Sequence, residues 1–459
     1  MKREDFEKLH DDPIHFCIIG HTNHGKTTTI RTLASDESIG VVANKANVTP
    51  GVSPYRISKN GKTQYWVYDT AGFSAFGRRM LQCEEDLEHR PNIHEFVDFL
   101  DRVTDPQAAE MAGSLRKVID CHLAVVVVDT RKSSSTADYL DEIDFLRTCG
   151  TPIVVSLNFL HSKKSKPETW RSQLIKLGVT NIVEFDAHVR TRKDEKNLFR
   201  SLEALSQSQL HKDFIEYWIE SRDRAAGEKD LRAIVSIKRG VFALSALSVQ
   251  KTKLNRGNAK VAQKQAIEEF QDMLADCLWK SLVDVLACYD VQEKYIELKT
   301  DGRRIRATNE RRGYPWRPNW FKAGTTGGAA ATVAAIEVAT GGITLGIPTA
   351  ITFLATYGGM QMAEVKMNPD GTAFTVAISH DQLIQLAGCM MEQAQRARIL
   401  GRGAFPSPND PNQTVPFQVY PKSNVFANDQ VREAVLDFAR TRPKRSESFD
   451  AKLMEILTQ

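Results

Sequence analysis

The sequence predicts an α/β fold, in which a mostly parallel sheet is flanked by helices, followed by a mainly α-helical C-terminal domain. Up to about residue 205, short apolar segments alternate with helical ones, which is typical of a parallel sheet with helices on its faces. A glycine-rich loop joins the apolar strand expected at 14–19 to the helical segment 28–33. Beyond residue 205 the apolar residues recur at helical spacing, as in long amphipathic helices.

The glycine-rich loop is the most specific motif, since Gly20, Gly25, Lys26 and Thr27 fill every fixed position of the pattern GxxxxGK[ST]. The glycines let the backbone fold so tightly that successive N–H groups point at a β-phosphate, and the lysine reaches the β- and γ-oxygens. A strand before the loop and a helix after it are the context that this motif requires, so the pattern predicts a P-loop NTPase. The expected nucleotide-binding residues of the loop are Gly20, His21, Thr22, Asn23, His24, Gly25, Lys26, Thr27 and Thr28.

A second motif follows the strand expected at 63–68. After a hairpin turn at 60–61, the strand 63–68 runs into a DxxG sequence that begins at Asp69 and ends at Gly72. In such folds the aspartate holds Mg²⁺ through water, and the glycine amide contacts the γ-phosphate. We therefore expect Mg²⁺ to be held by Thr27 and Asp69, and Gly72 to contact the nucleotide.

The segment 49–53 lies where the first switch of a GTPase is expected, directly before the strand 55–58. Ser53 or Thr49 supplies a hydroxyl that closes on the metal. Taken together, the loop, the sequence Pro50-Gly51-Val52-Ser53 and the DxxG motif resemble the Era/TrmE branch of small bacterial GTPases. Those proteins carry threonine where Ser53 stands, and serine keeps the hydroxyl ligand.

The resemblance implies GTP binding and hydrolysis with Mg²⁺, and it raises the question of how the γ-phosphate is cleaved. Phe73 stands where some GTPases place a water-orienting glutamine, and a phenylalanine cannot activate water. In the Era/TrmE class, an asparagine at the position of Asn23 helps to hold K⁺, whose charge replaces an arginine finger. K⁺ is therefore implied as a second cofactor, with catalytic roles for Lys26, Asn23 and Ser53.

The guanine-reading motif Asn-Lys-x-Asp is degenerate. A strand ends at Asn158, but Phe159 and His161 replace the lysine and the aspartate. Losing that carboxylate removes very roughly tenfold to several-hundredfold of discrimination against adenine, at about 1.5–3 kcal/mol per hydrogen bond. We expect Asn158, Phe159, Asp186 and Ala187 to complete the nucleotide site. In the alternative interpretation, Asn158 merely ends a strand and Phe159 belongs to the core.

This degenerate form, with Phe185-Asp186-Ala187 after the next strand, is similar to a bacterial family that joins such a GTPase domain to a C-terminal domain of unknown function. The expected organisation follows from these patterns. It comprises an N-terminal tail (1–12), a P-loop GTPase domain (13–205), a helical region (206–322), a Gly/Ala-rich hydrophobic hairpin (323–362) and a C-terminal helical region (363–459). An inserted helix is expected at 95–100, near the second switch, and helical runs at 210–219, 263–291, 381–391, 429–440 and 449–457.

Composition bounds the class of protein. Lys plus Arg (61) exceed Asp plus Glu (57) by only four, so nothing specific indicates a nucleic-acid partner. The seven cysteines form no CxxC pair, and Cys121 opens an apolar strand that makes it a core residue. With no apolar signal sequence at 1–5, we expect a cytoplasmic, reduced setting.

The Gly/Ala-rich segment 323–362 leaves two interpretations open. Glu337 is its only charged residue, and 338–360 is long enough to cross a bilayer core of about 30 Å. The preceding segment 311–322 interleaves basic and aromatic side chains, which suits the inner membrane surface. Either this region contacts the membrane peripherally, or it forms a hairpin buried through its small residues.

The sequence therefore predicts a Mg²⁺-dependent GTP-binding and hydrolysing switch. Its helical C-terminal domain would signal to an unknown protein partner or to a membrane surface. One alternative is a nucleotide-binding protein that hydrolyses weakly or not at all and acts in membrane-associated assembly. The other is an ATPase, which the degenerate base-reading motif favours.

Overall fold

The computed structural model of the chain divides into two compact units. The first is made mainly of Met1–Ala225 and the second of nearly all the rest. The structure describes residues 13–34, 41–44, 51–59, 62–73, 75–252, 259–291, 296–300, 303–305, 363–367, 373–400, 417–419, 429–441 and 447–458.

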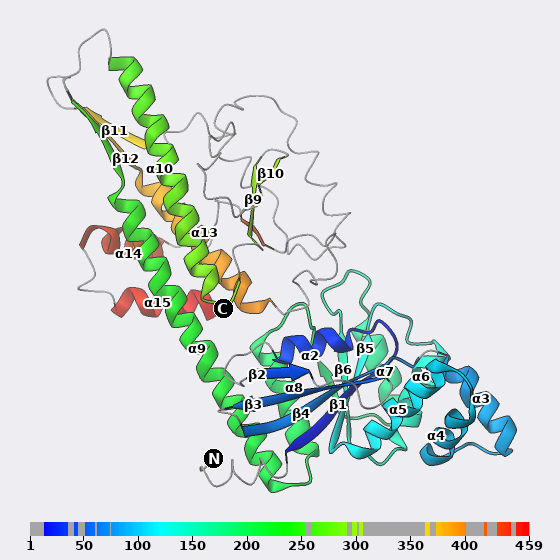
Figure 1. Ribbon diagram of the computed structural model, residues 1–459. Helices are drawn as coiled ribbons and strands as arrows, with labels where there is room; N and C mark the ends of the chain where they lie inside the picture. Colours follow the sequence, from blue (N-terminus) through cyan, green and yellow to red (C-terminus); the bar gives the residue numbers. More distant parts are fainter. Residues whose placement is uncertain are drawn as a thin grey trace. The chain divides into compact units, whose positions relative to one another are not determined.

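The first unit is built on a seven-stranded sheet of order β2-β3-β4-β1-β5-β6-β7 (Figure 1). Its strands are β1 (Ile14–Ile19), β2 (Val41–Asn44), β3 (Val52–Lys59), β4 (Lys62–Thr70), β5 (Leu123–Asp129), β6 (Ile153–Asn158) and β7 (Ile182–Glu184). From β4 to β7 every neighbouring pair is parallel, whereas β2, β3 and β4 pair antiparallel. The predicted α/β class with a mostly parallel sheet is confirmed.

Helices cover both faces of this sheet because alternate strand residues point to opposite sides. On β1, Cys17 and Ile19 enter one apolar cluster with residues of α3 to α7, whereas Phe16 and Ile18 enter a second cluster with residues of α2, α8 and α9. These helices are α2 (Lys26–Ala34), α3 (Phe76–Leu87), α4 (Ile93–Arg102), α5 (Pro106–Asp120), α6 (Ala137–Arg147), α7 (Pro167–Lys176), α8 (Arg192–Leu205) and α9 (Gln209–Ala246).

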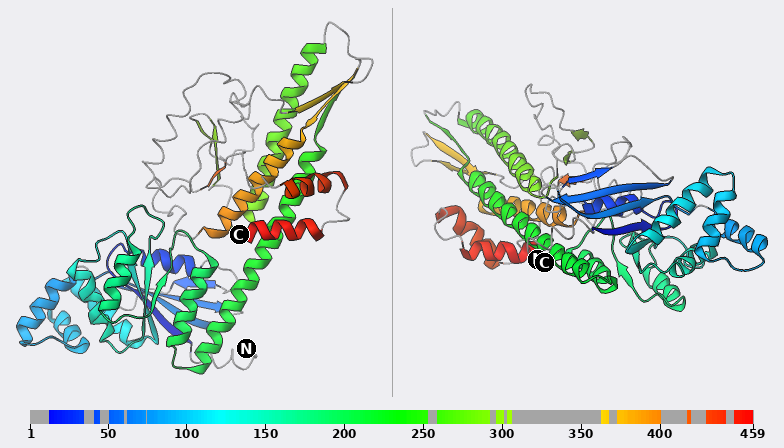
Figure 2. Two further views of the ribbon diagram at one scale, coloured as in Figure 1. Left: turned by 180° about the vertical axis from the view of Figure 1, so that it is seen from behind. Right: turned by 60° about the horizontal axis from the view of Figure 1, so that its bottom comes forward.

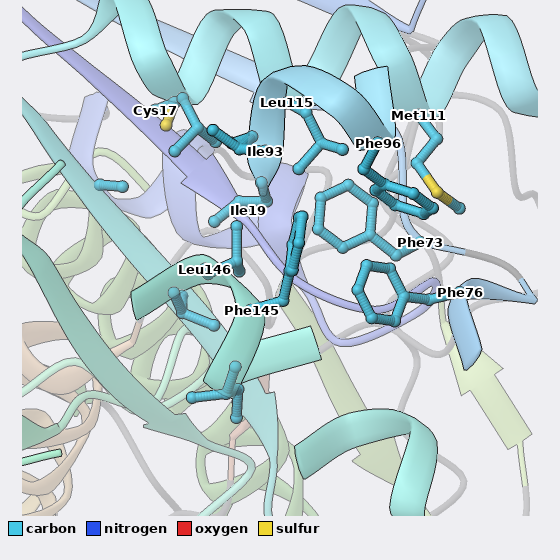
Figure 3. Packing of buried hydrophobic residues seen from close by; sticks show 14 of the residues in the cluster. Cys17, Ile19, Phe73, Phe76, Ile93, Phe96, Met111, Leu115, Phe145 and Leu146 are labelled. Atoms are coloured by element: carbon cyan, nitrogen blue, oxygen red, sulfur yellow. The ribbon is translucent and has the colours of Figure 1, made fainter. Parts of the chain in front are cut away.

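The connection from β4 to β5 holds more helix than the sequence predicted. The inserted helix expected at 95–100 is present as α4, which begins with a capping box between Asn92 and Glu95. It is accompanied by α3 and α5. These helices bury a cluster of aromatic rings formed by Phe73, Phe76 of α3, Phe96 of α4 and Phe145 of α6 (Figure 3). The connection therefore contributes its own part of the core.

The helix predicted after residue 205 is confirmed as α9, which Figure 2 shows as one uninterrupted helix. Its first turns bury Phe214, Ile215, Trp218 and Ile219 against the first unit's sheet. For this reason the boundary between the compact units lies after Ala225, beyond the expected domain end near 205.

The second unit is mainly helical but also holds strands that the sequence did not predict. Its further helices are α10 (Ala259–Ala287), α13 (His380–Ile399), α14 (Asp429–Thr441) and α15 (Glu447–Thr458). The strands β8 (Ser248–Lys251), β12 (Phe374–Ile378) and β11 (Ala363–Met367) form one sheet, and β10 (Arg303–Ile305), β9 (Ile296–Thr300) and β13 (Phe417–Val419) form another. Helices α9, α10 and α13 meet at Gly240, where a Cβ would lie 2.9 Å from Cβ of Ser281 and 2.7 Å from Sδ of Met390.

The Gly/Ala-rich segment 323–362 lies outside the described residues, so neither interpretation of it is tested. Among the helices that the structure describes, none is long and apolar enough to cross a membrane.

Candidate functional site

The predicted site residues gather at one edge of the first unit's sheet. Parallel strands end on the same side, and ligand sites of open α/β sheets lie outside these carboxyl ends. Strand β1 ends directly before Gly20, β4 ends before Gly72, β6 ends at Asn158, and β7 ends shortly before Asp186. The topology therefore brings the loop, the DxxG motif and the base-reading segments together.

Each motif glycine occupies a place where a side chain does not fit. Gly20 and Gly25 have φ values of +140° and +95°, which favour glycine. A Cβ at Gly25 would lie 2.4 Å from Nδ2 of Asn158, and a Cβ at Gly72 would lie 2.5 Å from the backbone nitrogen of Thr22. The DxxG glycine thus packs directly on the phosphate-binding loop.

Lys26 is folded back onto its own loop. It is the first residue of α2, and its Nζ donates hydrogen bonds to the carbonyl oxygens of Gly20 and His21, both at 3.0 Å. Burial lowers the pKa of Lys26, and the nearby carboxylates of Asp69 and Glu142 oppose this shift. The ammonium is buried at the N-terminus of a helix, where an anion is favoured.

The residues expected to hold Mg²⁺ converge and fit that ion. Thr27 donates its hydroxyl to Oδ2 of Asp69 at 2.5 Å. The other carboxylate oxygen, Oδ1, is buried and has no hydrogen-bond partner among the described residues. Burial raises the pKa of Asp69, against the lowering effect of the Thr27 hydrogen bond and of Lys26. A hydroxyl beside a buried, incompletely bonded carboxylate is a donor set of the kind that Mg²⁺ takes.

Ser53 is placed differently from the expectation. Strand β3 begins at Val52, so Ser53 lies inside the strand, directly opposite Asp69 on β4, and not in a loop before it. The pairing of β3 with β4 extends as far as Val52 and Thr70, which draws Ser53 into the ladder. Thr49 lies outside the described residues.

Asn23 and Phe73 lie in contrasting environments. Asn23 is exposed on the loop with a φ of 66°, a backbone conformation that asparagine tolerates better than most residues. Phe73 is fully buried, stacked on Phe76 with ring centroids 5.9 Å apart. The residue after the DxxG motif is therefore directed into the core and away from the loop.

Asn158 is the centre of a buried hydrogen-bond network. Its Nδ2 donates to the carbonyl oxygen of His24 at 3.0 Å, and its Oδ1 accepts from the backbone N–H groups of Phe159 and Ala187 at 2.9 and 3.0 Å. The side chain thus ties the loop to the segments after β6 and β7. The first of these bonds braces the loop from the end of strand β6.

Phe159 is only partly buried and belongs to neither of the two apolar clusters that flank the sheet. The guanidinium of Arg131 stacks on its ring at 3.6 Å from the centroid. Arg131 is itself held by Asp129, the last residue of β5, through hydrogen bonds of 2.9 and 2.8 Å. Arg131 belongs to none of the sequence motifs, although its position directly after a buried strand that ends in aspartate could have indicated a site residue.

Asp186 is buried, and its carboxylate is already occupied. Oδ2 accepts from the backbone N–H of His161 and lies 3.3 Å from Nδ1 of that ring, while Oδ1 accepts from the backbone N–H of His188 at 2.9 Å. Burial raises the pKa of Asp186, but these hydrogen bonds outweigh it and leave the pKa well below its ordinary value. His188 was missed, because nothing in its local sequence marks it.

Comparisons with known proteins agree with this geometry. Residues 15–159 match a model of the family described as 50S ribosome-binding GTPase. The chain is 27% identical over 155 residues to GTPase Der of Vibrio atlanticus, which covers 34% of this chain and 26% of that protein. It is 24% identical over 266 residues to translation initiation factor IF-2 of Sinorhizobium medicae, which covers 56% of this chain and 25% of that protein.

The match thus spans about a quarter of the length of these curated relatives. Among solved structures, the chain is similar to a GTP-binding protein from Sulfolobus solfataricus in complex with GDP. That likeness has 20% identity and a TM-score of 0.27, and it covers 44% of this chain and 56% of the other. The first unit thus has a P-loop GTPase fold, and its residues 15–159 match the GTPase family model, with distant similarity to GTPase Der and IF-2.

Proposed function

We propose that this protein is a Mg²⁺-dependent switch that binds and hydrolyses GTP. The observation that carries the proposal is the convergence of Lys26 with Thr27 and Asp69 at the N-terminus of α2. A buried ammonium, a hydroxyl and a carboxylate with a free oxygen are the groups that a nucleoside triphosphate and its Mg²⁺ require.

The residues of this chain would act mainly by electrostatics and positioning. The N–H groups of the loop bind the β-phosphate, and Lys26 exchanges its two carbonyl partners for phosphate oxygens. Thr27 and Asp69 would hold Mg²⁺, whose positive charge would stabilise the negative charge of the phosphates. Gly72 lies directly against Thr22 of the loop, which supports a role for the DxxG segment in sensing the γ-phosphate.

Hydrolysis would not use the residue after the DxxG motif, since Phe73 is in the core. Asn23 is exposed on the loop, and it supports the proposal that K⁺ assists the transfer. We expect faster hydrolysis in K⁺ than in Na⁺, and the same rate in both salts for Asn23→Ala. Equal wild-type rates in the two salts would remove the role of K⁺.

The second unit is proposed as the output part of the switch. Support comes from α9, which begins in the first unit and ends in the second as one helix. Its target would be a protein or the inner membrane surface, and the basic and aromatic run at 311–322 favours the membrane. Co-sedimentation with anionic liposomes, with and without a non-hydrolysable GTP analogue, distinguishes the two.

The proposed function is tested by titrating the protein with a fluorescent GTP analogue in the presence of Mg²⁺. Lys26→Ala should weaken binding by about 100-fold or more, because a charge-assisted contact to each of two phosphates is lost. Lys176→Ala, at an exposed position of α7, is the matched control and should bind as the wild type does. Unchanged affinity in Lys26→Ala would refute the assignment of the phosphate site.

A further inference from the structure

The phosphate-binding loop contacts helix α6 through the side chain of His21. Nδ1 of His21 lies 2.6 Å from Oε1 of Glu142, which belongs to α6. The Glu142 side chain is only 4% exposed. A carboxylate this deeply buried is costly unless it is paired, so the contact with His21 is part of what allows Glu142 to stand there.

Tyr139 lies one helical turn before Glu142 on the same face of α6. Its ring packs edge-on against two loop rings, with centroids 4.8 Å from that of His21 and 5.1 Å from that of His24. His24 is buried, with Nδ1 placed 3.2 Å from the carbonyl oxygen of Val127, while its Nε2 has no partner among the described residues. Two histidines of the loop are thus packed against side chains of α6.

The contact between Glu142 and His21 is linked directly to Lys26, the residue expected to bind the phosphates. The carbonyl oxygen of His21 accepts a hydrogen bond from Nζ of Lys26. The negative charge of Glu142 also acts on Lys26, since it is one of the two carboxylates that oppose the lowering of the lysine pKa. A displacement of His21 would therefore move a carbonyl that holds the lysine.

We propose that Glu142 is a positioning residue of the nucleotide site: its contact with His21 fixes the backbone of the phosphate-binding loop at His21 and, through the His21 carbonyl, the place of Lys26. The inference rests on the proposed function, because the effect is read out as nucleotide affinity. Glu142 acts through His21 and does not touch the nucleotide. None of the sequence motifs includes it.

The contact should also respond to pH near neutrality. Burial raises the pKa of Glu142 to about 7, against the lowering effect of His21 and Lys26, while Asp138 on the same helix raises it further. Tyr139 and His24 are the other titratable groups packed around His21. An ionised carboxylate accepts a stronger hydrogen bond than a protonated one, so the loop should be held more firmly above pH 7.

The test compares three variants of the full chain by titration with the fluorescent GTP analogue between pH 5.5 and 8.5. Glu142→Ala removes the contact, and we expect about tenfold weaker binding at pH 8. Glu142→Gln keeps an oxygen for His21, so it should recover most of the affinity but lose the rise centred near pH 7. Asp141→Asn, the same change at the adjacent exposed position of α6, should behave like the wild type. The nucleotide's own titration is common to all of them and cancels in the comparison.

A purely structural role for Glu142 makes a different prediction. It would lower the melting temperature of Glu142→Ala and leave affinity and pH profile unchanged, which would overturn the proposal. If Glu142→Ala fails to fold, His21→Gln probes the same contact from the loop, and wild-type affinity in that variant overturns the proposal as well. Absence of binding by the wild-type protein would instead refute the proposed function, so the two failures are distinguishable.

Discussion

The two ends of the candidate site differ in how they are built. At the phosphate end, Gly20, Gly25 and Lys26 stand at their motif positions, and backbone geometry explains each glycine. At the base end, only Asn158 keeps its motif identity. Phe159 there stacks under Arg131, and the carboxylate of Asp186 is occupied by His161 and His188.

This difference indicates that base recognition tolerates substitutions better than phosphate binding does. Phosphate binding depends on close backbone approach, and a Cβ at Gly25 would collide with Asn158, so few other residues fit. Base reading depends on side-chain groups that several segments can supply. The base end can therefore change its chemistry while Asn158 still ties it to the loop.

Among the changes that test this comparison of the two ends, the largest effect is expected where Gly25 of the loop contacts Asn158. Gly25→Ala places a Cβ 2.4 Å from Nδ2 of Asn158 and forces alanine to a φ of +95°. The loop must move to relieve this clash and strain, about 2–3 kcal/mol in all, and its N–H groups then no longer converge on the β-phosphate, so we expect GTP affinity to fall by about 100-fold. Titration with the fluorescent analogue measures it.

The matched control for this variant is Gly150→Ala. Gly150 also has a positive φ, +79°, but a Cβ there meets nothing within 4 Å. It reports the cost of the backbone conformation alone and should leave GTP affinity unchanged. Equal affinities of the two variants would mean that the contact with Asn158 is irrelevant to binding.

A smaller effect is expected at the base end. Arg131→Ala removes the guanidinium that covers the Phe159 ring, a contact worth about 0.5–1 kcal/mol at a partly exposed site. Affinities for GTP and ATP should both fall about two- to fivefold, measured by competition. Arg131→Lys should not restore them, since an ammonium lacks the planar face and the paired bonds to Asp129.

Arg102→Ala, at an exposed position of α4, serves as the control for Arg131→Ala. A loss confined to one of the two nucleotides would show that Arg131 reads the base directly. That outcome would contradict the view that it only supports Phe159.

The smallest effect is a pH-dependent change in stability. The hydrogen bond to Asp186 raises the pKa of His161, and the pKa of Asp186 is lowered despite burial. The histidine contribution is complete below its unfolded pKa of about 6.5 and is lost as pH rises through the folded value. The carboxylate contribution is present above about pH 4 and is lost only as pH falls further.

His161→Ala should therefore destabilise the protein more at pH 5.5 than at pH 8.5. The difference should stay below about 1 kcal/mol, because the His161 side chain is 41% exposed and solvent screens the pair. Urea unfolding at the two pH values measures it, with His94→Ala, at an exposed position, as the control. A larger loss at pH 8.5 would contradict the assigned direction.

The sequence predicted the phosphate end more completely than the base end for a physical reason. The loop and the DxxG motif carry their geometry in local residue order, so glycine spacing after an apolar strand is enough to place Gly20 and Gly72. The pairing that draws Ser53 into β3 depends on how far β4 extends, which local order does not show.

The base end depends on contacts across the fold. Arg131 and Phe159 follow different strands and meet only because β5 and β6 are adjacent in the sheet. Glu142 reaches His21 across 121 positions of the chain. In the second unit, β12 pairs with β8 from a distant part of the chain. Helical periodicity carries no information about such pairing, so the sequence did not predict these strands.

The most direct test of the account is competition between GTP and ATP for the wild-type protein in the presence of Mg²⁺. If affinity resides in the phosphate end, the two dissociation constants should differ by less than about tenfold, since the carboxylate of Asp186 is occupied by His161 and His188. His161→Asp should then widen the difference in favour of GTP. A wild-type preference for GTP of several hundredfold would contradict the account, because the base end would then be reading guanine through Asp186 or backbone groups.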